Sequence, residues 1–313
     1  MQNLFSYFES GRTNFTKKQC KLYKPRRCRT KMTNLKRSVT SSKPLPFFYA
    51  ILVSDTKSSW NTKKGGKNML YVKDLYKSYE AGKNKYQVLN GVSFHVAQGE
   101  FTAVMGPSGS GKTTLLNCIS CYIPFEKGSI TIGGTKLAGE KEERLAQIRN
   151  TKLGFVFQDF MLLDGLTIRE NILVPRMILG NVGQDAVQLA EKLAKMFGIG
   201  HILEKYPAEI SGGEKQRAAV ARSMMNHPMV ILADEPTGNL DSKSSRAVIE
   251  AFLEAKEQMK ATIFMVTHDS FAASFCDRVI LLKDGRLYRQ LEKKGSRKEM
   301  QEDLLGVIRE MSE

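Results

Sequence analysis

The sequence predicts an α/β fold built around a parallel sheet, with the functional groups at the carboxyl ends of its strands. Three apolar runs, "EFTAVM", "MVILAD" and "ATIFMV", have the length and composition of buried strands. A glycine-rich loop follows the first run, and polar or charged residues end the other two. Because doubly wound sheets bind ligands at the carboxyl ends of their strands, these groups are expected to converge on one site.

The loop after the first run, "GPSGSGKTT", fits the phosphate-binding pattern. Its glycines let backbone N–H groups face the phosphates, and "KTTLLNCIS" predicts a helix whose N-terminus faces the anion. Lys112 is expected to reach the β- and γ-phosphates of ATP, and the Thr113 hydroxyl to bind Mg²⁺. The predicted ATP-binding residues of this loop are Gly106, Pro107, Ser108, Gly109, Ser110, Gly111, Lys112, Thr113 and Thr114. Alone, the loop indicates a nucleoside triphosphatase and nothing narrower.

A second phosphate site is predicted at "ISGGEKQR", where a helix begins. Ser211 and Glu214 have capping-box spacing. Gly212 and Gly213 each cost about 1 kcal/mol of helix propensity, which makes sense if another group must approach the backbone closely. An ordinary capped helix would explain Ser211 and Glu214 but not the glycine pair. A helix N-terminus with a serine hydroxyl suits a phosphate.

The stretch "MVILADEPTGNLD" places two acids at the end of a buried strand. Asp234 is expected to hold the Mg²⁺ shell. Glu235 points the other way along the pleat and suits a general base that orients the attacking water. Burying two like charges without a cation is costly, which argues against a purely structural role for the pair.

Two further polar residues follow apolar runs. His268 ends "ATIFMVTH" and Gln158 ends "LGFVFQ". A lone histidine at a strand end is more often structural, but convergence with the other strand ends favours a catalytic role. Gln158 could reach Mg²⁺ and the water as a neutral ligand, and on spacing alone a plain loop amide explains it about as well. The predicted catalytic residues are Glu235, His268, Lys112 and Gln158, and the predicted metal ligands are Thr113, Gln158 and Asp234.

Taken together, these motifs resemble the nucleotide-binding subunit of an ABC transporter over residues 69–290. The phosphate loop, Gln158, "SGGEKQR", "ADEPTGNLD" and "THD" occur in the family's order and spacing. Tyr79 in "LYKSYEAG" matches the family's adenine-stacking aromatic, and Ile210 replaces the usual Leu before the signature serine. The resemblance implies a P-loop fold with a RecA-like core, an antiparallel β-subdomain and a helical subdomain at about 159–210.

The resemblance also implies partners. Two subunits would bind head to tail on ATP, so that Ser211, Gly212, Gly213 and Glu214 complete the partner subunit's site. Asp241 would lie in the loop that crosses this dimer interface, and a permease helix would dock beside Gln158. The subunit would therefore sit peripherally at the cytoplasmic side of the cell membrane, attached through its permease.

Within the family, "ADEPTGNLDSKSS" and "YPAEISGG" look most like the ATPases of bacitracin- and lantibiotic-resistance transporters, which implies export or removal of antimicrobial peptides. Lipoprotein-release, macrolide-export and cell-division ATPases share "EPTGNLD" and are the alternatives. A soluble ABC ATPase would usually have two cassettes or a coiled-coil insertion. A kinase would have no need for "SGGEKQR" or the Asp-Glu pair.

Most of the net positive charge lies in residues 1–68, before the segment that resembles the family. Of 48 Lys and Arg, 16 fall in residues 1–68 against the acids Glu9 and Asp55, a net charge of +14. The remaining 32 basic and 30 acidic residues leave +2, so the overall +16 is no argument for nucleic-acid binding. We expect translation to start at Met69 and residues 1–68 to be a spurious extension. A basic tether to anionic lipid is the alternative.

The other sequence features predict less chemistry. Cys118 and Cys121 have redox or metal spacing, but no second pair with this spacing exists, so small buried side chains are expected. The tail, residues 291–313, has Met300, Leu304, Val307, Ile308 and Met311 at helical spacing. It predicts an amphipathic helix that packs on the core or on a partner.

Overall fold

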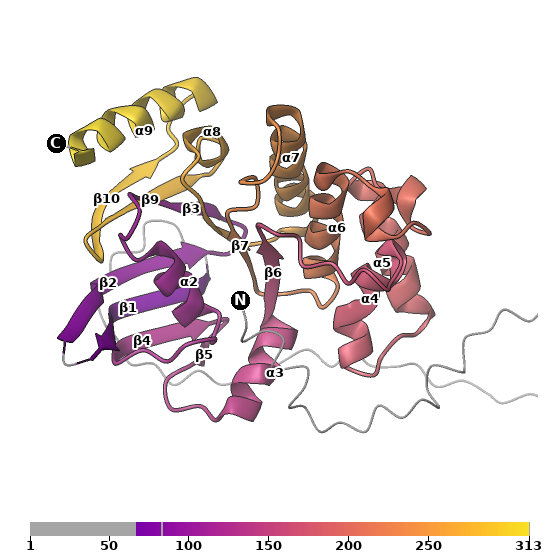
Figure 1. The fold of residues 1–313 in the computed structure, drawn as a ribbon, viewed down its shortest axis with the longest axis horizontal. Coiled ribbons are helices and arrows are strands. Elements are labelled where there is room, and N and C mark those ends of the chain that lie inside the picture. The colour runs from indigo at the N-terminus through magenta and orange to yellow at the C-terminus, as the bar shows by residue number, and fades with distance from the viewer. Residues whose placement is uncertain (1–66, 83, 313) are drawn as a thin grey trace, which may run out of the picture. The chain divides into compact units, whose positions relative to one another are not determined.

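The computed structural model describes residues 67–82 and 84–312, so most of the predicted extension, residues 1–66, lies outside it. The larger sheet has the strand order β10-β9-β3-β8-β7-β6 (Figure 1). Its strands are β3 (Phe101–Met105), β6 (Leu153–Phe157), β7 (Val230–Asp234), β8 (Ile263–Val266), β9 (Arg278–Lys283) and β10 (Arg286–Glu292). Neighbours pair in parallel except β9 and β10. The predicted parallel sheet is therefore present.

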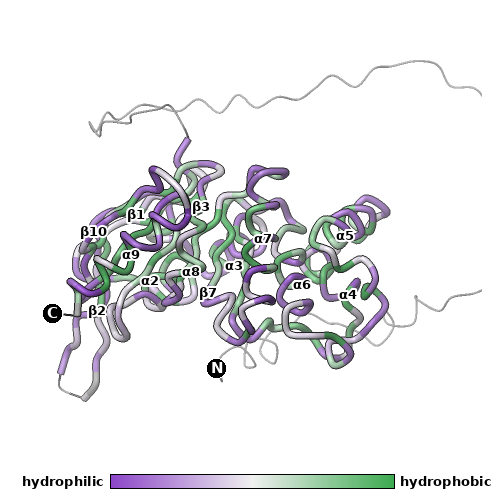
Figure 2. Tube along the Cα trace, turned by 90° about the horizontal axis from the view of Figure 1, so that it is seen from above, coloured by the Kyte–Doolittle hydropathy of each residue, from purple (hydrophilic) through white to green (hydrophobic). Residues whose placement is uncertain are grey.

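Both faces of this sheet are covered, which explains the uninterrupted apolar runs. Along β7, Ile231 and Ala233 pack into one hydrophobic cluster, whereas Val230 and Leu232 pack into another on the opposite face. The first cluster joins the sheet to helices α6 (Gly212–Met224), α7 (Ser242–Met259) and α8 (Ser270–Ala273). Figure 2 shows hydrophobic stretches mainly in the interior of the molecule and hydrophilic residues along many of the turns.

The second cluster joins the parallel sheet to an antiparallel one. The second sheet has the order β2-β1-β4-β5, with strands β1 (Asn68–Ala81), β2 (Asn84–Ala97), β4 (Lys127–Ile132) and β5 (Thr135–Lys136). Helix α2 (Lys112–Ile119) contributes Leu115, Leu116 and Ile119 to the cluster that both sheets share. The helix that follows the phosphate loop is thus fixed between two sheets. Helix α3 (Glu142–Lys152) leads into β6.

Helical structure fills the segment between β6 and β7. It comprises α4 (Ile168–Ile178), α5 (Gln184–Met196), the short helices η2 (Gly200–Ile202) and η3 (Pro207–Glu209), and α6. Thr167 caps α4, and its side chain and that of Glu170 form a reciprocal capping box, as their spacing predicts. Figure 1 shows α4 and α5 on the opposite side of the parallel sheet's strands from β1 and β2.

The C-terminal helix α9 (Arg297–Ser312) buries its predicted apolar stripe within the same chain. Met300 and Leu304 join the cluster around α6 to α8, and Val307 and Met311 pack on Leu281 of β9. At its first residue, the Arg297 guanidinium lies 4.9 Å from the ring centroids of both Phe271 and Phe275, on and beside α8. The stripe is thus a packing surface in this chain.

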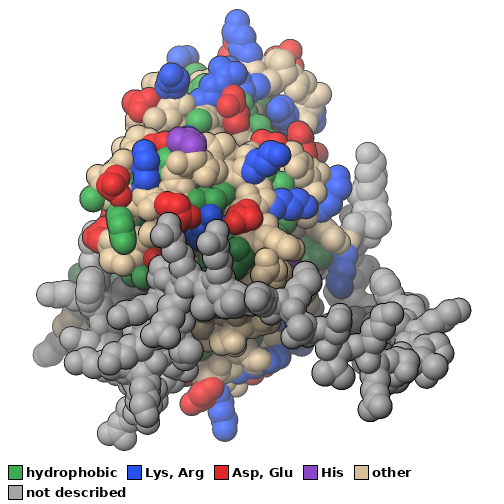
Figure 3. Space-filling view, turned by 90° about the vertical axis from the view of Figure 1, so that its right-hand side faces the viewer, with side chains coloured by type: hydrophobic (Ala, Val, Ile, Leu, Met, Phe, Trp, Pro, Cys, Tyr) green, Lys and Arg blue, Asp and Glu red, His purple; other side chains and the backbone are tan. Residues whose placement is uncertain are grey.

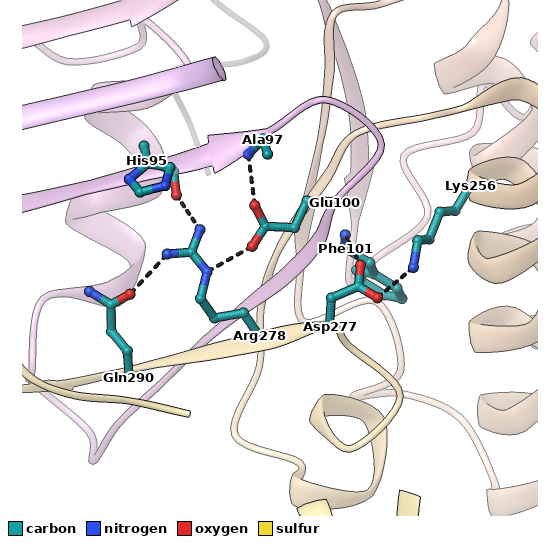
Figure 4. Close-up of polar contacts among 8 residues, drawn as sticks. All are labelled: His95, Ala97, Glu100, Phe101, Lys256, Asp277, Arg278 and Gln290. Atoms are coloured by element: carbon teal, nitrogen blue, oxygen red, sulfur yellow. Dashed lines mark hydrogen bonds and ion pairs between the residues drawn. The ribbon is translucent and has the colours of Figure 1, made fainter. Parts of the chain in front are cut away.

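An ionic network closes the amino-terminal edge of the parallel sheet (Figure 4). Arg278 of β9 is 8% exposed. Its Nε donates to Glu100 Oε1 at 2.7 Å, Nη1 donates to Gln290 Oε1 at 2.9 Å, and Nη2 donates to the His95 carbonyl. Glu100 Oε2 accepts from the Ala97 N–H at 2.7 Å. The network ties β2, β3, β9 and β10 together.

Candidate active site

The phosphate loop joins β3 to α2 at the opposite, carboxyl-terminal edge of the sheet. Gly111 is the N-cap of α2 at φ 97°, and no side chain caps this helix. The first N–H groups of α2 therefore have no side-chain partner, which is the arrangement that binds anions. A Cβ at Gly106 would lie 2.1 Å from the Leu282 carbonyl oxygen, so the approach of β9 leaves room only for glycine.

Two polar side chains of the loop suit a phosphate. Lys112 Nζ donates to the carbonyl oxygens of Gly106 at 2.8 Å and Pro107 at 2.9 Å. Burial lowers the pKa of Lys112, and the carboxylates of Glu235 and Asp234 oppose that shift. The Ser110 hydroxyl is buried and has no hydrogen-bond partner among the described residues. A cation and a free hydroxyl thus stand beside the helix N-terminus.

The strand ends next to the loop bring together two of the predicted catalytic residues, Glu235 and His268. Glu235 directly follows β7, its N–H donates to Val266 O at 2.8 Å, and its Oε2 lies 2.7 Å from His268 Nδ1. Glu235 has φ 44°, a left-handed conformation that is uncommon for a residue with a long side chain. The side chains of these two residues line a cleft of about 490 Å³ together with Thr267 and Phe271.

Asp234 lies at the end of β7, beside Glu235. Burial raises the pKa of Asp234, the Glu235 charge adds to that shift, and Lys112 opposes it. Ionisation of Asp234 is therefore less favourable here than in water, and a bound cation would oppose that effect. Lys112, Asp234, Glu235 and His268 thus meet at one edge of the sheet.

The signature helix α6 begins as its sequence predicts. Ser211 is the N-cap, and Ser211 and Glu214 form the reciprocal capping box, with Ser211 Oγ 2.6 Å from Glu214 Oε2. The glycine pair has a reason within this chain: a Cβ at Gly212 would lie 3.1 Å from Leu240 Cδ2, and one at Gly213 3.0 Å from Ser244. No hydrogen bond or ion pair among the described residues joins this helix end to the phosphate loop.

Comparisons with known proteins identify the group to which this site belongs. A family model described as "ABC transporter" matches residues 89–238. The bacitracin export ATP-binding protein BceA of Halalkalibacterium halodurans is 48% identical over 225 residues, which are 72% of this chain and 89% of that protein. The chain belongs to the ABC transporter family. It is an ATP-binding subunit with ATPase activity, as the family resemblance implies.

Further ABC relatives agree with this assignment. The lipoprotein-releasing system ATP-binding protein LolD of Pseudomonas fluorescens is 41% identical over 71% of this chain and 97% of its own length. A solved dimeric structure of the ATP-binding cassette MJ0796 with ADP and phosphate has a TM-score of 0.66 and 36% identity. It covers 72% of this chain and 100% of its own. The predicted P-loop ABC fold is confirmed.

The residues predicted to hold Mg²⁺ in this ABC subunit offer oxygen ligands. Thr113 is exposed at the first turn of α2, and Asp234 carries the carboxylate whose pKa is raised. The third, Gln158, donates through Nε2 to Asn239 Oδ1 at 3.0 Å. No group of three or more His, Cys, Asp or Glu side chains among the described residues could hold a metal alone. The oxygen-bearing side chains of Thr113, Gln158 and Asp234 are of the kind that Mg²⁺ uses, since it binds proteins through few side chains together with nucleotide phosphates.

The predicted adenine-stacking residue lies on the antiparallel sheet of the cassette. Tyr79 of β1 is 43% exposed and pairs across the strands with Tyr86 of β2, which is 55% exposed. The Lys77 ammonium lies 5.3 Å from the centroid of the Tyr79 ring. An exposed ring suits stacking on a base. Sequence reasoning missed Tyr86, although its aromatic side chain near Tyr79 in an adjoining strand could have indicated it.

The loop after Glu235 contains one residue that sequence reasoning used and one that it missed. Asp241 is the N-cap of α7 and accepts from the N–H groups of Lys243 and Ser244, each at 2.9 Å. Hydrogen bonds from Ser244 lower the pKa of Asp241. Asn239, which was missed, donates to Asp159 Oδ1 at 2.9 Å besides accepting from Gln158. Its place within "EPTGNLD" was the available signal.

Three cysteines of the cassette are buried, as expected for small packing residues. Burial raises the pKa of Cys118 to about 12 and that of Cys121 to about 11, and it raises the pKa of Cys276 strongly.

Within residues 67–82 and 84–312, no helix is long and apolar enough to cross a membrane. Figure 3 shows acidic and basic side chains intermixed on the face that it presents.

Proposed function

We propose that this subunit hydrolyses Mg²⁺-ATP to drive removal or export of antimicrobial peptides of the bacitracin or lantibiotic type. It would act through a separate permease at the cytoplasmic face of the membrane. The 48% identity to a bacitracin export ATP-binding protein carries the substrate proposal. The 2.7 Å contact between Glu235 and His268 beside Lys112 supports the proposed chemistry.

In this proposal each side chain acts by position or charge, which supplies most of the rate in phosphoryl transfer. Lys112 and the α2 N-terminus bind the phosphates, and Tyr79 stacks on adenine. Bound Mg²⁺ would neutralise charge on the phosphates, held by Thr113, Gln158 and Asp234. Glu235 orients and deprotonates the attacking water, and His268 fixes the Glu235 carboxylate.

The signature residues serve a second copy of the chain. Ser211, Gly212 and Gly213, with Glu214 holding the cap, would complete the ATP site of the partner subunit in a head-to-tail dimer, and the Asp241 loop would cross the interface. The dimeric MJ0796 cassette, which the fold matches with a TM-score of 0.66, supports a dimer.

Mixing two defective variants tests the shared site. Ser211→Ala should impair hydrolysis without weakening ATP binding to the monomer, and Lys112→Ala should weaken ATP binding itself. Their heterodimer contains one site with both defects and one site with neither. Activity of the mixture above that of either parent supports the shared site. Dimers of the wild-type chain with Lys112→Ala have one intact site and serve as the control. If these control dimers turn over and the mixture shows no gain, sharing is refuted.

Deletion of the gene in its host tests the substrate. The strain should become sensitive to bacitracin or a lantibiotic and should regain resistance with the wild-type chain but not with Glu235→Gln. Unchanged peptide sensitivity together with mislocalised lipoproteins would favour a lipoprotein-releasing role, and altered macrolide sensitivity would favour macrolide export. If the chain is purified from its host and no integral-membrane permease is bound to it, a soluble ABC ATPase would be favoured.

A further inference from the structure

The segment that carries Gln158 turns through two strained residues. Phe160 has φ 61° and Met161 has φ 49°. A left-handed backbone costs a residue with a side chain about 1–2 kcal/mol, so consecutive left-handed bulky residues need support from their surroundings. The turn is closed locally by two backbone bonds: the Phe160 N–H donates to Phe157 O at 3.2 Å, and the Met161 N–H donates to Asp159 O at 2.5 Å. A backbone hydrogen bond contributes only about 1 kcal/mol net, so two local bonds do not exceed the cost of two left-handed residues.

The support comes from Arg222 on the signature helix α6. Its Nη2 donates to Phe160 O at 2.8 Å, and its Nη1 donates to Met161 O. Arg222 has no carboxylate within ion-pair distance in the described part of the chain. Burial lowers the pKa of Arg222 to about 10. Among the described residues, its hydrogen-bond partners are these two carbonyls. Burying a charge is costly unless hydrogen bonds satisfy it, and these two carbonyls satisfy two of the guanidinium donors.

The same turn touches both halves of the proposed ATP machinery. On one side, the Gln158 amide is bonded to Asn239 in the loop after Glu235. On the other side, the ring of Phe160 lies against the signature, because a Cβ on Gly212 would be 3.6 Å from Phe160 Cζ. A second residue of α6, Gln216, donates to Phe157 O at 3.0 Å. A shift of this turn would therefore move Gln158 and the signature contact together.

We propose that Arg222 is a positioning residue that holds residues 158–161 in their left-handed turn, and thereby sets Gln158 for the chain's own ATP and Phe160 against the signature that serves the partner's ATP. This rests on the proposed function for the roles of Gln158 and the signature. The guanidinium is suited to the task because its fixed fork can reach two neighbouring carbonyls at once, whereas a lysine ammonium is a single point of charge.

The test compares Arg222→Met with Arg176→Met in the full chain. Arg176 also donates to a carbonyl at the α6 end, Met225 O at 3.0 Å, but it makes no contact with residues 158–161. Arg222→Met should speed amide hydrogen exchange in the peptide covering 157–164 of the nucleotide-free protein, and Arg176→Met should leave that peptide unchanged. This readout needs neither Mg²⁺ nor hydrolysis.

Kinetics give the second readout. Arg222→Met should lower kcat about tenfold, the size expected for one charge-assisted hydrogen bond, and raise the Mg²⁺ concentration for half-maximal rate. Binding of a fluorescent ATP analogue without Mg²⁺ should stay within about twofold of the wild-type chain, since the phosphate loop is untouched. Gln158→Ala should reproduce the Mg²⁺ effect without faster exchange, and the double variant should lose less than the sum of the two.

A rescue variant separates positioning from plain stability. Because glycine adopts the left-handed conformation without steric cost, Met161→Gly should restore part of the kcat lost in Arg222→Met. Arg222→Lys replaces Arg222→Met if that variant does not fold, with an intermediate effect expected. Equal behaviour of the Arg222 and Arg176 variants, or unchanged exchange in 157–164, overturns the proposal. Absence of Mg²⁺-ATPase activity in the wild-type chain would instead overturn the proposed function and leave the exchange result standing.

Discussion

The two edges of the parallel sheet differ in whether their charged side chains are in favourable surroundings. At the amino-terminal edge, the side chains of Arg278 and Glu100 are only 9% and 15% exposed. Hydrogen bonds join them to each other, to Gln290 and to the backbone of His95 and Ala97 (Figure 4). At the carboxyl-terminal edge, Asp234 has a raised pKa and Glu235 has a left-handed backbone. The first arrangement stabilises the fold, and the second retains unfavourable groups that a ligand would relieve.

The largest effect is expected at the carboxyl-terminal edge. Glu235→Gln keeps the shape of the side chain but removes the base, so kcat should fall by about 10²- to 10⁴-fold. ATP binding should persist, and a dimer should accumulate in ATP and Mg²⁺, detectable by size-exclusion chromatography. Near-normal turnover would show that Glu235 is not the base.

At the amino-terminal edge the loss should be of stability rather than of activity. Arg278→Met leaves the largely buried Glu100 carboxylate without its cation and with only the Ala97 N–H as donor, which should lower the free energy of unfolding by about 3–5 kcal/mol in urea titrations. Lys256→Met breaks the more exposed contact to Asp277, and the control should cost no more than about 1 kcal/mol. Turnover per folded molecule should not change in either variant. A kcat defect without destabilisation would contradict the division between the edges.

A smaller effect should expose the strain at Glu235. Glu235→Ala and Glu235→Gly both lose the contact with His268, but only the alanine keeps the steric cost of φ 44°. The glycine variant should therefore be the more stable by about 1 kcal/mol, the reverse of the order usual inside helices. Thermal unfolding of the two proteins measures the difference, and a more stable alanine variant would argue against backbone strain here.

The smallest effect concerns pH. The folded-state pKa of Asp234 is raised, chiefly by burial, so the folded protein binds this proton more tightly than the unfolded chain does. Its contribution therefore becomes unfavourable as pH rises through the unfolded-state pKa towards the raised value. Asp234→Asn should raise the melting temperature of the nucleotide-free protein at neutral pH while abolishing Mg²⁺-dependent hydrolysis.

The helix cap at Asp241 serves as a control, because its pKa is shifted in the opposite direction from that of Asp234. Its folded-state pKa is lowered by hydrogen bonds, so its contribution is present at neutral pH and is lost as pH falls through the lowered value. Asp241→Ala should accordingly lower the melting temperature at neutral pH. If Asp234→Asn and Asp241→Ala shift the melting temperature in the same direction, burial does not make ionised Asp234 unfavourable for stability.

The difference between the edges also shows what a sequence can predict. Residues consecutive in a motif, such as 106–114 or the caps at Thr167 and Ser211, were predictable because local spacing determines their geometry. The network around Arg278 was not, because it joins residues up to 183 positions apart that share no motif. The intrachain packing at Gly212 and Gly213 was missed for the same reason, since Leu240 and Ser244 approach only in the folded chain.

Some predictions could be made from motifs in the sequence, and others needed the contacts seen in the structure. The fold and family follow from five motifs in register, and the comparisons confirm them. The Glu235–His268 contact gives the predicted pair a geometry, and Gln158 is found bonded to Asn239, which no spacing rule indicates. Left-handed residues at Phe160 and Met161 could not be foreseen, because neither residue type favours that conformation.

The packing around the glycine pair has an evolutionary consequence. In a descendant of this chain that lost hydrolysis, packing would still favour glycine at 213, because a Cβ there would lie 3.0 Å from the Ser244 side chain, which would have to shift. Glu235 has no comparable structural duty and occupies a backbone conformation that glycine and asparagine adopt more readily. We expect relaxed selection to alter position 235 first, while the signature glycines persist. Among duplicated copies of the gene, an intact "SGG" is therefore a poor indicator that the product still hydrolyses ATP. The residue at position 235 is a better indicator of that activity.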